Sequence, residues 1–171
     1  CRVFQREFGV PTLIEGYGMS EIPGVLSNPF EGPQKIGSMG RPSAHPDPAV
    51  PPPELRIVDE AGRDVPDGQT GELWIGGPMV VPGYWANAEA TAASFTAGWW
   101  HSGDLGSVDA QGFVRVFDRK KDMLNRGGYK IYSVEVENVL MAWPGMVEAA
   151  VVGKPCPVLG ERVHAVLHAP G

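Results

Sequence analysis

Glycine and proline interrupt the chain along its whole length, and this feature limits its fold more than any other. The 171 residues include 23 glycines and 17 prolines, which form no repeat and stand between short apolar runs. In this setting they predict many short strands joined by turns rather than disorder. Eight prolines fall within residues 28–53, so we expect that segment to be irregular or extended.

A series of β-prone segments follows the proline-rich stretch. Residues 54–59 and 71–77 alternate apolar and polar side chains, as half-buried strands do. Residues 101–109 and 112–118 flank a turn with the sequence DAQG, which predicts a hairpin. Residues 87–95 predict a short helix whose first residue, an asparagine, is the N-cap. The series as a whole predicts a small barrel or sandwich.

The character of the sequence changes at residues 119–122. Their sequence, RKKD, has no large apolar side chain and predicts a linker. Residues 133–143 predict a helix with one apolar face and with Ser133 as N-cap, and residues 147–153 and 162–169 predict strands. A helix and strands within about fifty residues form a small α+β unit, so the predicted fold class is mixed α+β.

Composition excludes several classes of function. A net charge of −6 argues against a nucleic-acid backbone as partner. No apolar run approaches the ~20 residues of a membrane helix, and the N-terminus has no signal-peptide pattern, so we expect a cytoplasmic protein. The chain does not begin with methionine, and we expect it to be a piece of a longer protein. Cys1 and Cys156 lie far apart and predict unpaired thiols.

Residues 15–21, EGYGMSE, place a ring, a hydroxyl and two carboxylates in a loop at the end of a strand predicted over 12–17. A nucleophile elbow needs G-x-S-x-G before a helix, and both the second glycine and the helix are missing. Ser20 is therefore an ordinary loop serine or a phosphate donor. Glu21 is a solvated carboxylate or, beside the preceding backbone amides, a ligand for a magnesium–phosphate group. Tyr17 offers a flat face to a base.

Two further segments carry candidate binding residues. Asp104, in WWHSGDLG, is a turn residue or an acceptor for two sugar hydroxyls. Arg119, in DRKKD, belongs to a solvated basic corner or binds phosphate and ribose oxygens. His101, His164 and His168 have no spacing that defines a metal site, and we expect them to be structural.

Five motifs, in this order, resemble the core motifs of the adenylate-forming enzymes. That superfamily comprises acyl-CoA synthetases, the adenylation domains of nonribosomal peptide synthetases and firefly-type luciferases. The resemblance covers almost the whole chain, and its motifs are GYGMSE, GELWIGG…VVPGYW…T…F, WWHSGDLG, DRKKDMLNRGGYKIYSVEVE and PGMVEAAVVGKP…GER. The fourth motif looks more like acyl-CoA synthetases than peptide-synthetase domains, which favour R-x-D-x-Q there.

The resemblance implies an ATP-dependent ligase that converts a carboxylic acid to an acyl-adenylate and then forms a thioester with CoA. The implied cofactors are ATP, Mg²⁺ and CoA, and the implied partner is a small carboxylic acid, with no nucleic acid and no integral membrane segment. For ATP and AMP the resemblance implies Gly16, Tyr17, Gly18, Met19, Asp104 and Arg119. It implies that Ser20 faces the phosphate, that Glu21 holds Mg²⁺ and that Lys121 is the hinge. Along the CoA channel it implies Gly128, Tyr129 and Lys130.

The same resemblance implies three parts of the chain. Residues 1–118 are the C-terminal part of the large AMP-binding domain with its small barrel-like β subdomain, 119–122 are the hinge, and 123–171 begin a mobile α+β lid domain. Two half-reactions in one cleft need such a moving lid.

The chain also departs from the family. Asp118 stands where glycine is usual, Trp100 where tyrosine is common and Ser102 where threonine is common. The family's glycine-rich phosphate loop and late catalytic lysine are not in these residues, so we expect the 171 residues alone not to catalyse adenylation. Two alternatives stay open: a non-catalytic nucleotide-binding or scaffold relative, and an adenylation domain that loads a carrier protein.

Overall fold

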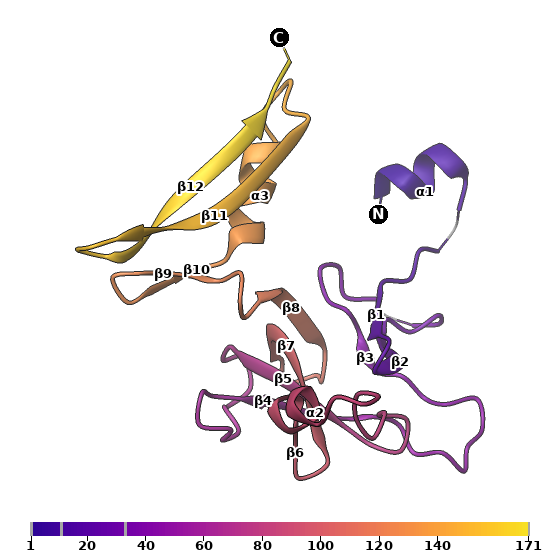
Figure 1. Cartoon of the computed structure of the whole chain (residues 1–171). Coiled ribbons are helices and arrows are strands. Elements are labelled where there is room, and N and C mark those ends of the chain that lie inside the picture. The colour runs from indigo at the N-terminus through magenta and orange to yellow at the C-terminus, as the bar shows by residue number, and fades with distance from the viewer. Residues whose placement is uncertain (1, 11, 33, 171) are drawn as a thin grey trace. The chain divides into compact units, whose positions relative to one another are not determined.

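The computed structural model describes residues 2–10, 12–32 and 34–170 (Figure 1). They divide into two compact units, and the boundary between the units crosses two strands. The first unit holds Cys1–Ser102 and Gly106–Val116, and the second holds Gly103–Leu105 and Phe117–Gly171. The predicted mixed α+β class is confirmed, with strands outnumbering helices in the described residues.

The first part of the chain forms one helix and a small antiparallel sheet. These elements are α1 (Arg2–Phe8), β1 (Gly16–Met19), β2 (Ile22–Ser27) and β3 (Arg41–Pro42), with strand order β1-β2-β3. The predicted strand over 12–17 is displaced, because extended pairing begins only at Gly16, opposite Ser27. The proline-rich segment is largely irregular, as expected, since its prolines lack the backbone donor that a sheet needs.

A second sheet follows, and it is open. Its elements are β4 (Glu54–Val58), β5 (Gly71–Gly76), α2 (Ala88–Ser94), β6 (Phe95–Thr96), β7 (Trp99–Val108) and β8 (Val114–Arg119), in the order β4-β5-β7-β6 with β8 also paired to β7. Among the described residues these strands close no barrel, so the expected small barrel is replaced by an open sheet. The predicted cap is present, because Asn87 Oδ1 accepts a hydrogen bond from Ala90 N at 3.0 Å.

One hydrophobic core joins the two sheets within the first unit. Side chains from β2 pack with side chains from β4, β5, β7 and β8 because each strand turns an apolar face inward. The buried members are Ile22, Val25, Leu26, Ile57, Leu73, Ile75, Trp100 and Val114. The loop between β1 and β2 is therefore anchored by its second strand in this core.

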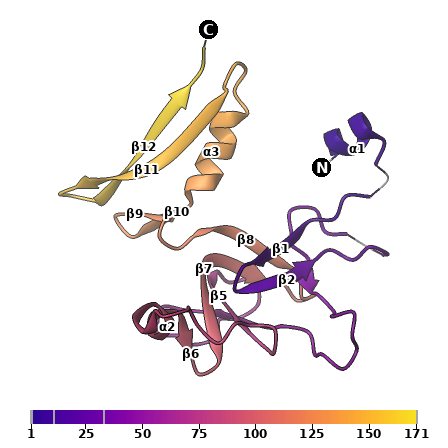
Figure 2. The ribbon, with the colours of Figure 1, turned by 45° about the vertical axis from the view of Figure 1, so that its right-hand side comes forward.

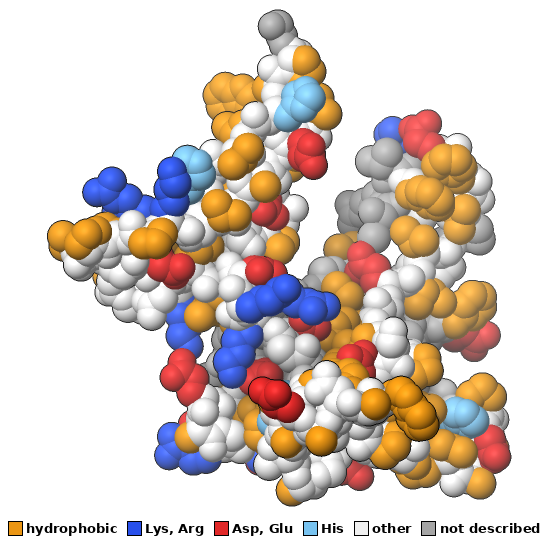
Figure 3. Space-filling model, viewed as in Figure 1, with side chains coloured by type: hydrophobic (Ala, Val, Ile, Leu, Met, Phe, Trp, Pro, Cys, Tyr) orange, Lys and Arg blue, Asp and Glu red, His pale blue; other side chains and the backbone are white. Residues whose placement is uncertain are grey.

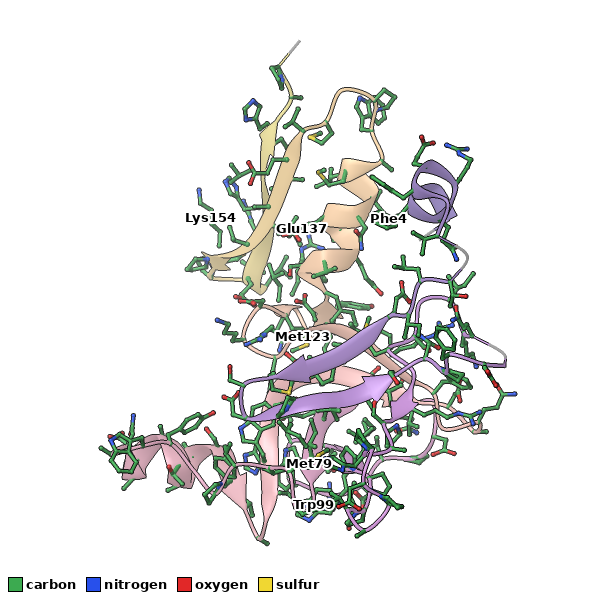
Figure 4. The ribbon with its side chains drawn as sticks, turned by 90° about the vertical axis from the view of Figure 1, so that its right-hand side faces the viewer. Phe4, Met79, Trp99, Met123, Glu137 and Lys154 are labelled. Carbon is green, nitrogen blue, oxygen red and sulfur yellow. The ribbon has the colours of Figure 1, made fainter. Side chains whose placement is uncertain are left out.

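The second unit adds a helix and four strands. They are β9 (Leu124–Arg126), β10 (Tyr129–Ile131), α3 (Ser133–Met141), β11 (Glu148–Cys156) and β12 (Gly160–His168), with strand order β10-β9-β12-β11. Helix α3 lies alongside the β11–β12 hairpin in Figures 1 and 2. Glu137, labelled on α3 in Figure 4, accepts a hydrogen bond from Val151 N of β11 at 2.8 Å.

Two expectations for α3 are corrected. Ser133 is not the N-cap: it is the first helical residue, and the cap position, Tyr132, has no side-chain hydrogen bond to the helix. The acceptor at this helix end is instead Asp118, which takes hydrogen bonds from Ser133. The predicted apolar face is also incomplete, because Val139 is 74% exposed and Trp143 lies beyond the last helical residue.

Acidic and basic side chains are interspersed on the face shown in Figure 3. None of the described helices is both long and apolar enough to cross a membrane. Cys156 is a free, buried thiol, as predicted, and Cys1 lies outside the described residues.

Candidate functional site

The β1–β2 hairpin carries six of the predicted site residues. Met19 pairs with Ile22, which leaves Ser20 and Glu21 as a two-residue loop. Between this pair and the next, Tyr17 with Leu26, the register shifts and β2 bulges. Here the two backbones approach so closely that a Cβ on Gly18 would lie 2.6 Å from the amide nitrogen of Gly24. A side chain at position 18 therefore has no room.

The two sides of β1 differ in exposure. Tyr17 and Met19 are half-buried against the hydrophobic core, whereas Gly16, Gly18 and Ser20 are exposed. A ligand at this hairpin would therefore meet bare backbone and a hydroxyl on one side. Exposed amides without side chains suit close approach to phosphate oxygens.

Glu21 accepts two hydrogen bonds, one at its backbone and one at its side chain. Its backbone carbonyl accepts a hydrogen bond from Val81 N at 3.0 Å. Its carboxylate oxygen Oε1 accepts a hydrogen bond from Tyr84 Oη at 2.8 Å. The hydroxyl of Tyr84 in turn accepts a hydrogen bond from Trp100 Nε1 at 3.3 Å. The side chain is half-buried and held at one of its two oxygens, so it is not a freely solvated glutamate.

The side chains around Glu21 allow only one kind of magnesium site. In the described part of the chain, no three His, Cys, Asp or Glu side chains come together as a metal-binding group. A magnesium ion at Glu21 would therefore take one carboxylate from these residues and the rest of its ligands from phosphate and water. That is the usual arrangement for Mg²⁺ bound with a nucleotide.

Asp104 and Arg119 form an ion pair within the second unit. Asp104 lies on β7 and is buried, whereas Arg119, the last residue of β8, has a side chain that is 61% exposed. Arg119 Nε lies 3.1 Å from Asp104 Oδ1. The pair brings an acceptor and a planar donor side by side, which suits the hydroxyl and phosphate oxygens of a nucleotide.

A pocket of about 320 Å³ lies at this ion pair. It is lined by Gly103, Arg119, Lys120 and Lys121. Lys120 N donates to the carbonyl of Gly103 at 2.8 Å, which fixes the start of the predicted hinge against β7. Three basic side chains around one pocket favour an anionic ligand. Lys121, predicted as the hinge residue, is exposed in the turn that follows β8.

The residues predicted for the CoA channel lie on the β9–β10 hairpin. Arg126 pairs with Tyr129, so Gly127 and Gly128 form its two-residue loop, with φ of +61° and +90°. Such a loop requires positive φ at both positions, which is why the sequence places two glycines there. The Tyr129 ring is 79% exposed, and Lys130 follows it along β10.

The predicted residues thus gather on three separate structures. Gly16 to Glu21 share one hairpin, and Gly128 to Lys130 share another. Arg119 and Lys121 line one pocket, and Asp104 forms an ion pair with Arg119. The hairpin at Glu21 belongs to the first unit, and the other two belong to the second.

Sequence reasoning missed the partners of Glu21. Tyr84 stands in the quoted motif VVPGYW, and Trp100 was noted only as a departure from the family. Nothing in the linear pattern joins position 84 or 100 to position 21, since the contact depends on the path of the intervening chain. The same holds for the role of Asp118 at α3.

Comparison with known proteins adds independent findings. A family model described as AMP-binding enzyme matches residues 1–85. The chain is 42% identical over 152 residues to a long-chain-fatty-acid–CoA ligase of Escherichia coli O6:H1, a match that covers 88% of the chain and 26% of that ligase. It is 44% identical over 157 residues to a feruloyl-CoA synthase of Amycolatopsis, a match that covers 91% of the chain and 30% of the synthase.

A solved structure agrees with these sequence matches. The o-succinylbenzoate CoA synthetase (MenE) of Bacillus subtilis, in complex with ATP and magnesium, superposes with a TM-score of 0.81 at 34% identity. The match covers 97% of the chain and 34% of that enzyme. The chain therefore spans about a quarter to a third of the length of these relatives.

Proposed function

Because the chain belongs to the adenylate-forming, AMP-binding superfamily, we propose that it is part of an AMP-forming acyl-CoA synthetase. Such an enzyme joins the carboxylate of an acid to the α-phosphate of ATP and releases pyrophosphate. The sulfur of CoA then attacks the acyl carbon and AMP leaves. Two of the relatives described above are named as a long-chain-fatty-acid–CoA ligase and a feruloyl-CoA synthase.

The observation that carries the proposal is the ion pair of buried Asp104 with exposed Arg119 beside a pocket of basic residues. A buried carboxylate is retained where a partner or ligand compensates its desolvation. Asp104 can accept hydrogen bonds from two ribose hydroxyls, and Arg119 can donate to ribose or phosphate oxygens on the same side. The pair therefore supports nucleotide binding by the second unit.

The β1–β2 hairpin supports the phosphate end of the same proposal. The exposed backbone of Gly18 and the hydroxyl of Ser20 donate to phosphate oxygens, and the half-buried ring of Tyr17 offers a flat face to the base. Glu21 holds the magnesium ion, which when bound neutralises charge on the phosphates. Ser20 acts as a donor and forms no covalent bond.

The acceptor side rests on the β9–β10 hairpin. Gly128, Tyr129 and Lys130 offer a loop without side chains, an exposed ring and a cation next to one another. These are the groups that a pantetheine chain with a phosphate at its end would contact. We propose that this hairpin guides the CoA thiol during the second half-reaction, with Lys121 as the point about which the lid turns.

The proposal is tested with the full-length protein and a panel of carboxylic acids. The panel contains saturated fatty acids of increasing length and hydroxycinnamic acids, since these are the acid classes named for the relatives. We expect acid-dependent exchange of pyrophosphate into ATP without a thiol, and stoichiometric AMP release when CoA is added. Exchange that no acid stimulates would contradict the proposal and favour a non-catalytic nucleotide-binding relative.

The same assay separates the two possible acceptors. With an active acid in hand, AMP release is measured with CoA and with a phosphopantetheinylated carrier protein. We expect turnover with free CoA. Turnover that occurs only with the carrier protein would reassign the chain to the adenylation domains that load carriers.

A further inference from the structure

We propose that Tyr84 is a positioning residue that fixes the carboxylate of Glu21 for its magnesium–nucleotide ligand. The inference rests on the proposed function, because it assigns Glu21 the role given above. It begins from a hydrogen-bonded chain in the first unit, in which Trp100 Nε1 lies 3.3 Å from Tyr84 Oη and Tyr84 Oη lies 2.8 Å from Glu21 Oε1.

The chemistry of the three side chains determines which group donates and which accepts in each of these hydrogen bonds. An indole nitrogen can only donate a hydrogen bond, so the oxygen of Tyr84 accepts from Trp100. A carboxylate can only accept, so the proton of Tyr84 points to Glu21. A single orientation of the Tyr84 hydroxyl therefore satisfies both hydrogen bonds. Hydrogen bonds in such a chain polarise one another and strengthen the bond to the charged end.

Tyr84 is itself held firmly. Its backbone amide donates to Thr91 Oγ1 at 2.9 Å, and the hydroxyl of Thr91 donates to the carbonyl of Asn87 at 2.8 Å. Its ring meets Phe95 edge to face, with the centroids 5.9 Å apart. A Cβ on Gly83 would lie 2.7 Å from Thr91 Cγ2, so the loop and α2 are in close contact here.

The supports of Tyr84 come from α2, β6 and β7, whereas Glu21 lies in the β1–β2 loop. Residues 63 positions apart thus meet at one carboxylate. A loop glutamate with three free torsions would lose rotamer entropy on binding a metal. A glutamate already fixed at Oε1 has lost much of that freedom, and its Oε2 can bind the ion in a fixed place. Preorganisation of this kind raises affinity without adding a contact to the ligand.

The test measures the equilibrium affinity of the full-length protein for ATP by titration calorimetry, in the absence of any carboxylic acid. Each variant is titrated with ATP plus Mg²⁺ and with ATP plus a chelator. We expect Tyr84→Phe to weaken Mg–ATP binding by about three- to tenfold, because it removes a hydrogen bond to a charged group, and to leave chelated ATP unchanged. Thr91→Val loosens the backbone of Tyr84 without altering its ring, and we expect a smaller loss that is again confined to Mg–ATP.

A double-mutant cycle distinguishes positioning from a general structural effect. In a Glu21→Gln background, Tyr84→Phe should cause no further loss, since the group through which it acts has changed. Tyr132→Phe is the matched control, because it removes the same atom in the second unit, and it should leave both affinities unchanged. Thermal melting of each variant checks that the protein is folded.

The possible results separate this inference from the proposed function. A wild-type protein that binds ATP equally with and without Mg²⁺ overturns the metal role of Glu21 and the positioning role together. A wild-type preference for Mg–ATP that Tyr84→Phe retains in full overturns the positioning role alone. Equal losses for Mg–ATP and chelated ATP, or losses that add to those of Glu21→Gln, also overturn it.

Discussion

The carboxylate of Asp118 accepts hydrogen bonds from both the amide and the hydroxyl of Ser133, at 2.6 and 2.8 Å. Its other oxygen accepts from the amide of Arg119 at 2.8 Å. Ser133 begins α3, whose first amides have no partner within the helix. A residue from the end of β8 therefore performs the capping task that a side chain at the cap position usually performs.

Replacement of Asp118 should therefore destabilise the second unit. Asp118→Ala leaves the buried amide and hydroxyl of Ser133 without an acceptor, and we expect a loss of about 2 kcal/mol in the free energy of unfolding. Asp118→Asn keeps an acceptor oxygen and should lose less. Chemical denaturation of the full-length protein and hydrogen exchange of the α3 amides measure the effect. Unchanged exchange in the first turn of α3 would show that the cap does not hold the helix.

Arg119 should matter for the nucleotide and little for stability. Its side chain is mostly exposed, and exposed ion pairs contribute about 0–1 kcal/mol. We expect Arg119→Ala to leave the melting temperature nearly unchanged and to weaken ATP binding about tenfold. Arg119→Lys restores the charge without the planar fork and should recover only part of the affinity.

An exposed arginine in the first unit is the control for this comparison. Arg63 pairs with Asp59 at 2.8 Å, and its side chain is 79% exposed. Arg63→Ala should therefore resemble Arg119→Ala in melting temperature and the wild type in ATP affinity. If the two variants bind ATP equally well, the nucleotide role of Arg119 is wrong.

The closest backbone approach in the hairpin predicts the effect of adding one methyl group. In Gly18→Ala the new Cβ would meet Gly24 N at 2.6 Å, so β1 and β2 must move apart. We expect a loss of about 1–3 kcal/mol in stability together with weaker ATP binding. In Gly24→Ala the Cβ meets nothing within 4 Å, and only the φ of +69° is unfavourable, which costs about 1–2 kcal/mol. A crystal structure or amide chemical shifts of the hairpin would show whether Gly18→Ala alone displaces it.

Asp109 should contribute to the pH dependence of stability. A hydrogen bond from Lys35, with backbone hydrogen bonds from Phe113 and Gln111, lowers the pKa of Asp109 below its ordinary value of 3.8. A pKa that is lower in the folded state stabilises the protein above the unfolded pKa and ceases to do so as the pH falls through the folded pKa. Asp109→Asn should therefore melt at a lower temperature than the wild type above about pH 5, and the difference should vanish in stronger acid. Parallel melting curves from neutral pH down to acid would contradict this assignment.

Local patterns in the sequence predicted the elements well. The α2 helix with its Asn87 cap, the hairpin over residues 101–118 and the strands of the β11–β12 hairpin follow from alternation, turn residues and capping, which act over a few neighbouring positions. The strand over 12–17 was misplaced because β-propensity alone does not fix where pairing starts. That point depends on the partner strand, Ile22–Ser27.

Tertiary relationships escaped prediction for a different reason. The contacts of Glu21 with Tyr84 and of Asp118 with Ser133 join residues 63 and 15 positions apart, and no periodic pattern encodes them. The roles of the hairpin and pocket residues came from resemblance to a family and stay predictions. What the structure adds is their local setting: exposed glycine backbone, a fixed glutamate and a buried aspartate paired with an arginine.

The division of β7 between the two units limits how related enzymes can recombine. Asp104 groups with the second unit although it precedes the last residues of the first, Gly106–Val116. A single crossover at residue 118 would therefore take Arg119 from one parent and its ion-pair partner from the other. The offspring keep the pair only when the parent of the N-terminal segment has an acid at 104 and the parent of the C-terminal segment has an arginine at 119. The ion pair therefore joins two chain segments that a simple exchange at residue 118 would separate.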